Sequence, residues 1–239
     1  METLFLVKLI LAHLLGDFIL QSKRTVEHKK AKKVASIHLY LHGLIHGALV
    51  WILLFEWHYW WAALYVFVVH ILIDALKLYL DRREKLHWFV LDQFLHIASL
   101  IMLWLFVNDV SVLCQYTLNF PNEQFFTIAT AYVFISWPAS FLLKAMLKSF
   151  QFKQIEANES LQNAGQAIGI LERILTLTFI LISQYEVIGY LIAAKSLLRF
   201  REGNSHEPRI QTEYLIIGTL LSFMTSLLVG LSIKAFIAI

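Results

Sequence analysis

Histidine and aspartate recur in pairs along the first part of this chain, within stretches that are otherwise apolar. The pairs read H-L-L-G-D at 13–17, H-I-L-I-D at 70–74 and D-Q-F-L-H at 92–96, and a fourth stretch, 38–46, has three histidines at the same spacing. Residues four positions apart lie on one face of a helix, about one turn from each other. Imidazole and carboxylate groups on facing helices are typical ligands of zinc, iron or manganese.

The composition indicates that these helices lie in a membrane. Of the 239 residues, 59% are hydrophobic and 15% are charged, whereas a soluble globular protein has about 25% charged residues. The net charge of +3 suggests no nucleic acid partner. Cys114 is the only cysteine, which excludes an intramolecular disulfide and a cysteine-rich metal site.

Eight apolar stretches are long enough to cross a bilayer, whose hydrocarbon core requires about 20 residues per helix. The sequence therefore predicts an all-α, polytopic transmembrane bundle of about eight helices. The first four form a His/Asp motif domain (1–107) built from two hairpin-like copies, an external loop follows (108–123), and the last four form a C-terminal half (124–239). The predicted helices lie near 3–22, 36–55, 60–80, 87–107, 124–147, 164–183, 186–200 and 213–236.

The basic residues predict the orientation of the bundle. The loops after the first, third, fifth and seventh helices all contain Lys or Arg, whereas the joins at 56–59, 108–123 and 184–185 contain neither. By the positive-inside rule the first set of loops is cytoplasmic, so both termini face outside. We expect a multi-pass protein of the inner (plasma) membrane.

Depth in the membrane relates the four motif helices to one another. Counted from the cytoplasmic end of each helix, Asp17, His42, Asp74 and Asp92 lie at one level, and His13, His46, His70 and His96 lie about one turn deeper. The order of His and Asp is reversed in the fourth helix, which runs in the opposite direction to the first and third. This agreement favours a metal centre over isolated polar pairs that hold helices together, because buried carboxylates are costly in a membrane.

We predict a site with one or two divalent transition metal ions (zinc, manganese or iron). The predicted ligands are His13, His42, His46, His70 and His96. Asp17, Asp74 and Asp92 are either further ligands or catalytic residues that act as a general base or orient a histidine. Whether His38 and Lys77 belong to the site is left open.

The second half carries a different set of ionisable residues at the cytoplasmic side. Arg173, Lys195 and Arg199 form a predicted cationic cluster for an anionic headgroup. Glu172 and Glu213 are predicted to form structural ion pairs with such residues.

The motifs H-L-L-G-D-F-I-L-Q at 13–21, H-I-L-I-D-A-L-K at 70–77 and D-Q-F-L-H at 92–96 resemble those of a family of bacterial multi-pass membrane proteins. That family is known only as a domain of unknown function (number 3307). The resemblance is concentrated in residues 1–105 and supports the membrane assignment and the motif positions, but it implies no activity. A looser similarity links the chain to membrane-bound metal-dependent hydrolases, at the level of ligand types only.

The leading hypothesis is a metal-dependent hydrolase that acts at the cytoplasmic leaflet on a lipid-linked or amphipathic substrate. A bound metal would activate water and polarise the scissile group. The first alternative is a metal-ion or proton-coupled transporter that uses the same His and Asp residues. The second is a non-catalytic membrane subunit whose polar pairs set helix register.

Overall fold

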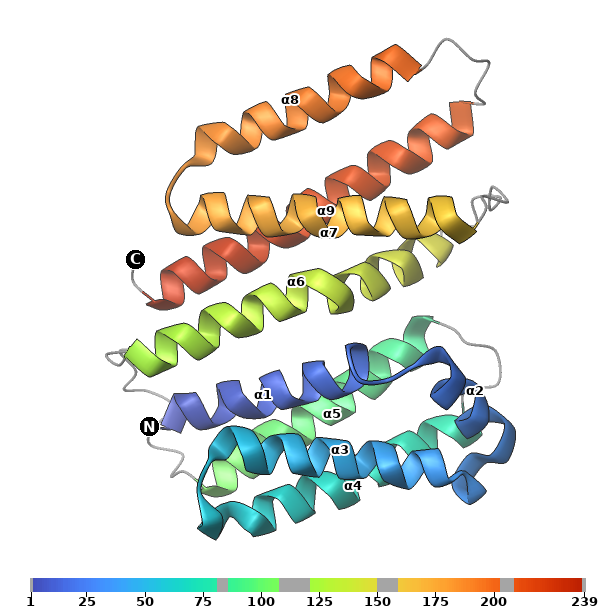
Figure 1. Ribbon diagram of the computed structural model, residues 1–239, viewed down its shortest axis with the longest axis vertical. Coiled ribbons are helices and arrows are strands. Elements are labelled where there is room, and N and C mark those ends of the chain that lie inside the picture. Colours follow the sequence, from blue (N-terminus) through green and yellow to red (C-terminus); the bar gives the residue numbers. More distant parts are fainter. Residues whose placement is uncertain (1, 81–85, 108–120, 150–158, 203–208, 238–239) are drawn as a thin grey trace. The chain divides into compact units, whose positions relative to one another are not determined.

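The computed structural model describes residues 2–80, 86–107, 121–149, 159–202 and 209–237 (Figure 1). All regular secondary structure in these ranges is helical, which confirms the all-α prediction for this part of the chain. The chain divides into two compact units, residues 1–130 and 131–239, and the boundary between them falls inside helix α6.

The first unit is built around four helices that pack in a closed ring. They are α1 (Glu2–Phe18), α3 (Ile37–Leu54), α4 (Trp60–Leu80) and α5 (Leu86–Val107). Helix α1 contacts α3 and α5, and α4 contacts the same two helices from the other side. Successive helices of the ring run in opposite directions (Figure 1). The second half of α1 therefore lies level with the first half of α3, the second half of α4 and the first half of α5.

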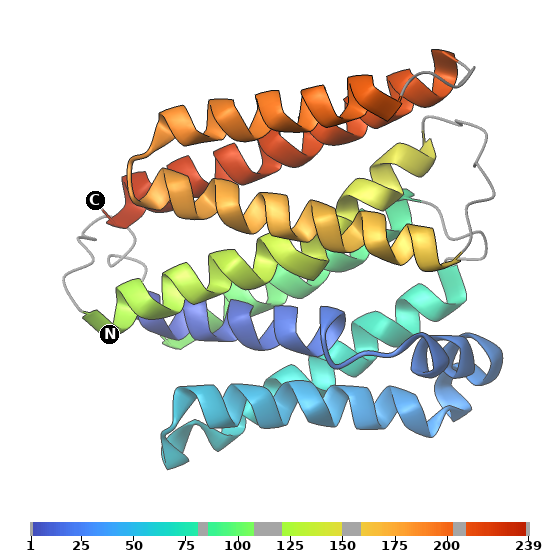
Figure 2. The same cartoon turned by 45° about the horizontal axis from the view of Figure 1, so that its top comes forward.

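One helix of this unit was not predicted. Helix α2 (Lys23–Lys32) and the short helix η1 (Lys33–Ala35) occupy the expected first loop. The predicted first helix continued to residue 22, but α1 ends at Phe18, because Ser22 caps the N-terminus of α2 through a capping box with Thr25. The chain bends by 82° between the two helices, and Figure 2 shows α2 lying across the end of the bundle.

The interior of the bundle is divided along its length. Apolar side chains from the first half of α1 pack with those from the matching halves of the other three helices; examples are Leu9, Val50, Val66 and Leu103. The opposite half, on the side of α2, contains all four His/Asp motifs. Close packing depends on Gly16 in the polar half, where an added Cβ would lie 2.4 Å from the imidazole of His46. It also depends on Gly47 near the middle of α3, where an added Cβ would lie 3.0 Å from the backbone carbonyl of Ala63 in α4.

The second unit contains most of α6 (Pro121–Ser149), together with α7 (Glu159–Leu181), α8 (Tyr185–Glu202) and α9 (Arg209–Ile237). Helix α7 packs against α9 and α8. Two small apolar clusters hold the unit together, one around Ile135 and Leu177 and the other around Ile180 and Phe223.

Five helical segments in the described residues are long and apolar enough to cross a membrane. They are Ile37–Leu54, Trp57–Leu80, Leu86–Val107, Glu123–Leu147 and Ile216–Ile237, and a sixth is possible if the bent pair Thr3–Phe18 and Lys23–Ala35 counts as one broken span. These segments indicate a membrane protein. Helices α7 and α8 form at two of the predicted positions, but neither is among these segments.

Candidate metal centre

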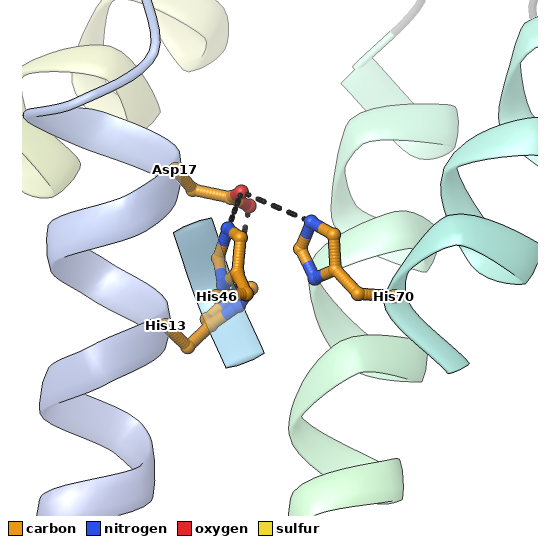
Figure 3. A group of neighbouring side chains, drawn as sticks. All are labelled: His13, Asp17, His46 and His70. Carbon is orange, nitrogen blue, oxygen red and sulfur yellow. Dashed lines mark hydrogen bonds and ion pairs between the residues drawn. The ribbon is translucent and has the colours of Figure 1, made fainter. Parts of the chain in front are cut away.

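The carboxylate of Asp17 lies at the centre of the polar half of the first unit. Its Oδ1 atom lies 3.1 Å from Nε2 of His46 and 3.5 Å from Nε2 of His70, and its Oδ2 atom lies 3.7 Å from Nε2 of His13. Figure 3 shows these three imidazoles converging on the carboxylate from α1, α3 and α4. The side chain of His42 also reaches it, with Nε2 3.1 Å from Oδ1.

The imidazoles also contact one another. The rings of His46 and His70 stack with centroids 3.6 Å apart, and His70 lies 4.2 Å from His96 on α5. His13 stacks on His96 at 5.1 Å. All of these histidines are at least 97% buried. The structure therefore brings together the five histidines that the sequence identified as candidate ligands.

The separations between these atoms suit a metal ion. Zinc lies about 2.0–2.2 Å from nitrogen and oxygen ligands, so tetrahedral ligand atoms lie roughly 3.3–3.5 Å from each other. The separations around Asp17 span this range. His13, Asp17, His46 and His70 each offer a ligand atom within 4.8 Å of the others, and two further groups meet the same criterion: His42, His70 and Asp74; and Asp74, Asp92 and His96.

Two of the three carboxylates already have a lysine partner. The ammonium group of Lys29 lies 2.6 Å from Oδ2 of Asp74, and that of Lys77 lies 2.7 Å from Oδ2 of Asp92. Among the described residues, the ion pairs of Asp17 are with histidines alone. A buried, ionised carboxylate needs a countercharge, so the charged form of Asp17 requires either a protonated imidazole or a bound cation.

Several buried polar atoms in this region have no hydrogen-bond partner in the described structure. They are Nδ1 of His46, Nε2 of His70, Nε2 of His96 and Oδ1 of Asp92. His96 is the clearest case: its Nδ1 donates to the backbone carbonyl of Asp92 at 2.9 Å, which leaves a lone pair on Nε2. Unpartnered buried acceptors usually indicate an ion or water.

A small cavity adjoins the histidine rings. It is lined by the rings of His13, His46, His70 and His96, by Ser99 and by apolar side chains such as Leu9, Val50, Val66 and Leu100. The cavity lies between the histidines and the apolar half of the bundle. Its lining includes three of the imidazoles that contact Asp17, but not Asp17 itself.

Two glutamines and two lysines complete the site. The amide nitrogen of Gln93 donates to Oδ2 of Asp17 at 3.0 Å, and the amide of Gln21 lies 2.8 Å from Nε2 of His42. Gln93 stands next to Asp92 in the D-Q-F-L-H motif, but its role was not predicted. Lys29 was counted only among the loop residues that orient the bundle, and no sequence signal pointed to its contact with Asp74. Lys77, which was left open, belongs to the site through Asp92.

His38 does not join the central cluster in the described structure. Its ring contacts the ring of His28 at 4.7 Å, near the junction of η1 and α3. His28 in turn contacts the hydroxyl of Ser36 at 2.7 Å. This pair fastens the end of α2 to the start of α3.

The candidate anion-binding residues of the second unit are engaged in helix contacts. Arg173 is buried and donates to the backbone carbonyls of Ile135 and Ser136 at 2.6 and 3.2 Å, and to the hydroxyls of Ser140 and Ser222. Lys195 pairs with Glu172 at 2.5 Å. The side chains of Arg199 and Glu213 lie outside the described residues. An anion-binding role for this cluster stays a prediction.

Comparison with known proteins identifies one family. A family described as "Protein of unknown function (DUF3307)" matches residues 5–127, a range that includes the whole His/Asp cluster. Neither a curated protein nor a solved structure matches the chain.

Proposed function

The chain belongs to the DUF3307 family of proteins of unknown function, and we propose that it is a metal-dependent hydrolase of the inner membrane. The proposed enzyme holds a divalent transition metal (zinc, manganese or iron) in the first unit. It acts from the cytoplasmic leaflet on a lipid-linked or amphipathic substrate.

The observation that carries this proposal is the environment of Asp17. Its carboxylate faces imidazole nitrogens at 3.1–3.7 Å, and its described ion pairs are with histidines alone. In the same cluster Asp74 and Asp92 are neutralised by lysines of the chain. We therefore expect a cation to bind at Asp17 in preference to Asp74 or Asp92. We assign His13, His46, His70 and Asp17 as the ligands.

Catalysis at this metal requires a coordination position for water or substrate beyond the four protein ligands, because four ligands alone close a tetrahedral zinc site. Zinc can expand to five ligands during catalysis. The cavity beside His13, His46 and His70 is about large enough for one water molecule. A metal at this place would polarise a carbonyl or phosphoryl group and lower the pKa of a bound water.

His96 is the best-placed general base. It lines the same cavity, and its Nε2 lone pair has no partner among the described residues. A neutral imidazole in this state accepts a proton from water in one step. Asp92, whose backbone carbonyl accepts the other ring proton, orients it.

The direction of access follows from the distribution of polar groups. Beyond the histidines, one half of the bundle is filled with apolar side chains such as Leu9 and Leu103. The other end carries Gln21, Lys29 and Lys77. A polar or charged substrate headgroup enters more easily at the second end, which the positive-inside rule assigns to the cytoplasm.

The first test is the metal content of the full-length protein purified in detergent. Elemental mass spectrometry should find about one transition metal ion per chain, lost in Asp17→Asn and His70→Ala and retained in Glu56→Gln, which removes an exposed carboxylate. Release of headgroup or fatty acid from phospholipid vesicles by the metal-loaded protein, but not by His96→Ala, would support hydrolysis. Absence of metal from folded protein after reconstitution with zinc, manganese and iron would refute the proposal.

Transport is the second candidate, and one observation favours it. His42 lies within 3.1 Å of Asp17 and 3.9 Å of Asp74, which in turn contacts Lys29. This continuous series of titratable groups has the form of a proton or cation path. Flux of zinc or protons into proteoliposomes, abolished by Asp17→Asn, would favour the carrier over the hydrolase.

A further inference from the structure

Lys29 is set apart from the other basic residues of α2 and η1. Lys23, Arg24, Lys32 and Lys33 are exposed, whereas Lys29 is 5% exposed and extends from α2 into the bundle. Its ammonium group lies 2.6 Å from Oδ2 of Asp74, in the middle of the polar half. Burial of a lysine at such a position requires a specific partner, because an unpaired buried ammonium is costly.

The oxygen that Lys29 contacts also belongs to a potential cation site. His42, His70 and Asp74 offer ligand atoms within 4.8 Å of one another. Nε2 of His42 lies 3.9 Å from the same Oδ2 of Asp74. Nε2 of His70 faces this group as well, but it also lies 3.5 Å from Oδ1 of Asp17 and can bind only one ion at a time.

We propose that Asp74 and His42 form a second cation site, and that the ammonium group of Lys29 is its resident and displaceable occupant. A metal ion at this site and Lys29 compete for one carboxylate. Because His70 also faces Asp17, the second site adjoins the proposed metal centre. This inference rests on the proposed function in treating the cluster as a metal-binding one, and it adds a means of regulation.

Competition at Asp74 links metal binding to the docking of α2. Helix α2 is polar and lies across the bundle at 82° to α1, and within the described ranges Lys29 is the one buried residue of this helix. Entry of a cation at Asp74 releases Lys29 and loosens α2. By linkage, release of α2 must strengthen cation binding to the same extent.

The test is to count zinc ions in the full-length wild type and in Lys29→Met, with Lys23→Met as a control that removes an exposed lysine from the same helix. After desalting, which removes the zinc that Lys29 displaces, we expect one ion in the wild type and in Lys23→Met, and two in Lys29→Met. One ion in both the wild type and Lys29→Met would overturn this inference and leave the proposed function intact. No ion in the wild type and one in Lys29→Met would support the second site and refute the Asp17 centre, and no ion in either would refute both.

A second measurement on the wild type covers the case in which Lys29→Met does not fold. Hydrogen exchange of residues 23–33 should rise by about tenfold when zinc is raised beyond the first equivalent, since α2 loses its anchor. In Asp74→Asn, which has no competing carboxylate, exchange in α2 should be fast at the outset and insensitive to zinc. Unchanged protection of α2 in zinc-saturated wild type would overturn the inference.

Discussion

Oδ1 of Asp17 lies 3.1 Å from Nε2 of His46, although the two residues are on different helices and 29 positions apart in the chain. The contact depends on the closeness of α1 and α3. Asp17 belongs to the level predicted for the carboxylates, and His46 belongs to the imidazole level about one turn deeper. Residues from both predicted levels therefore lie in one cluster. The following predictions depend on this cluster and on the groups that surround it.

Asp17→Asn should abolish stabilisation by metal. The substitution preserves the size of the side chain and removes the charge that the ligand imidazoles share. Zinc at about 100 times its Kd raises the free energy of unfolding of a one-site protein by about 2.7 kcal/mol. In a thermal unfolding experiment we expect this gain in the wild type and in Glu56→Gln, but not in Asp17→Asn. If zinc stabilises Asp17→Asn as much as it stabilises the wild type, the metal is bound by residues other than Asp17.

Gly16→Ala should disrupt the cluster without replacing a ligand. A Cβ atom at Gly16 would lie 2.4 Å from Nε2 and Cε1 of His46, so the imidazole must move or α1 must shift away from α3. We expect bound metal to fall at least tenfold, because ligand geometry must hold to about 0.5 Å. Gly189→Ala is the control, since its added Cβ would meet nothing within 4 Å outside the backbone of its own helix and its chain neighbours. Metal content measured on both folded variants tests the prediction, which fails if the two are alike.

Much of the first unit could be predicted from the sequence, because its helices have apolar stretches of sufficient length and its motifs repeat at helical spacing. The i, i+4 spacing places His13 with Asp17 and His70 with Asp74 on one face each. Burial of those faces then brings the motifs together. Local patterns were sufficient for this part of the site.

The countercharges of the site could not be predicted in the same way. Lys29 lies in a basic segment whose composition is typical of an exposed loop, and its burial depends on the bend between α1 and α2. The partner of Asp92 could not be predicted from the sequence either, since Lys77 is placed beside it only by the packing of α4 against α5. Long side chains reach partners that helix periodicity does not specify. For this reason the sequence left open which carboxylate requires a metal.

Removal of one partner of the Lys77–Asp92 ion pair should destabilise the protein more than removal of both. Asp92 is 4% exposed, so Lys77→Met strands a buried carboxylate, whereas Lys77 is itself partly exposed. Breaking a buried pair costs about 3–5 kcal/mol, and replacing both partners with apolar groups is often neutral. We expect a loss of about 3 kcal/mol in Lys77→Met and recovery of most of it in Lys77→Met/Asp92→Leu. Denaturant unfolding of the single and double variants measures this coupling, and equal losses in the two proteins would contradict it.

Arg173 should support the structure of the second unit through backbone carbonyl groups. Pro138 lacks an N–H group and interrupts the hydrogen bonding of α6. One turn before it, Nε of Arg173 donates to the carbonyl of Ile135, and the second terminal nitrogen donates to that of Ser136. Removal of a donor from a buried acceptor costs about 1–3 kcal/mol.

We therefore expect Arg173→Met to lower the unfolding temperature markedly, and Arg173→Lys to do so less, because an ammonium group can still donate to these carbonyls. Lys195→Met is the control: it removes a partly exposed partner from Glu172, and such pairs contribute about 1 kcal/mol or less. The structural role predicts unchanged metal content in all three variants. If Arg173 binds an anionic substrate instead, Arg173→Lys should retain the unfolding temperature and raise KM, a combination that would refute the structural assignment.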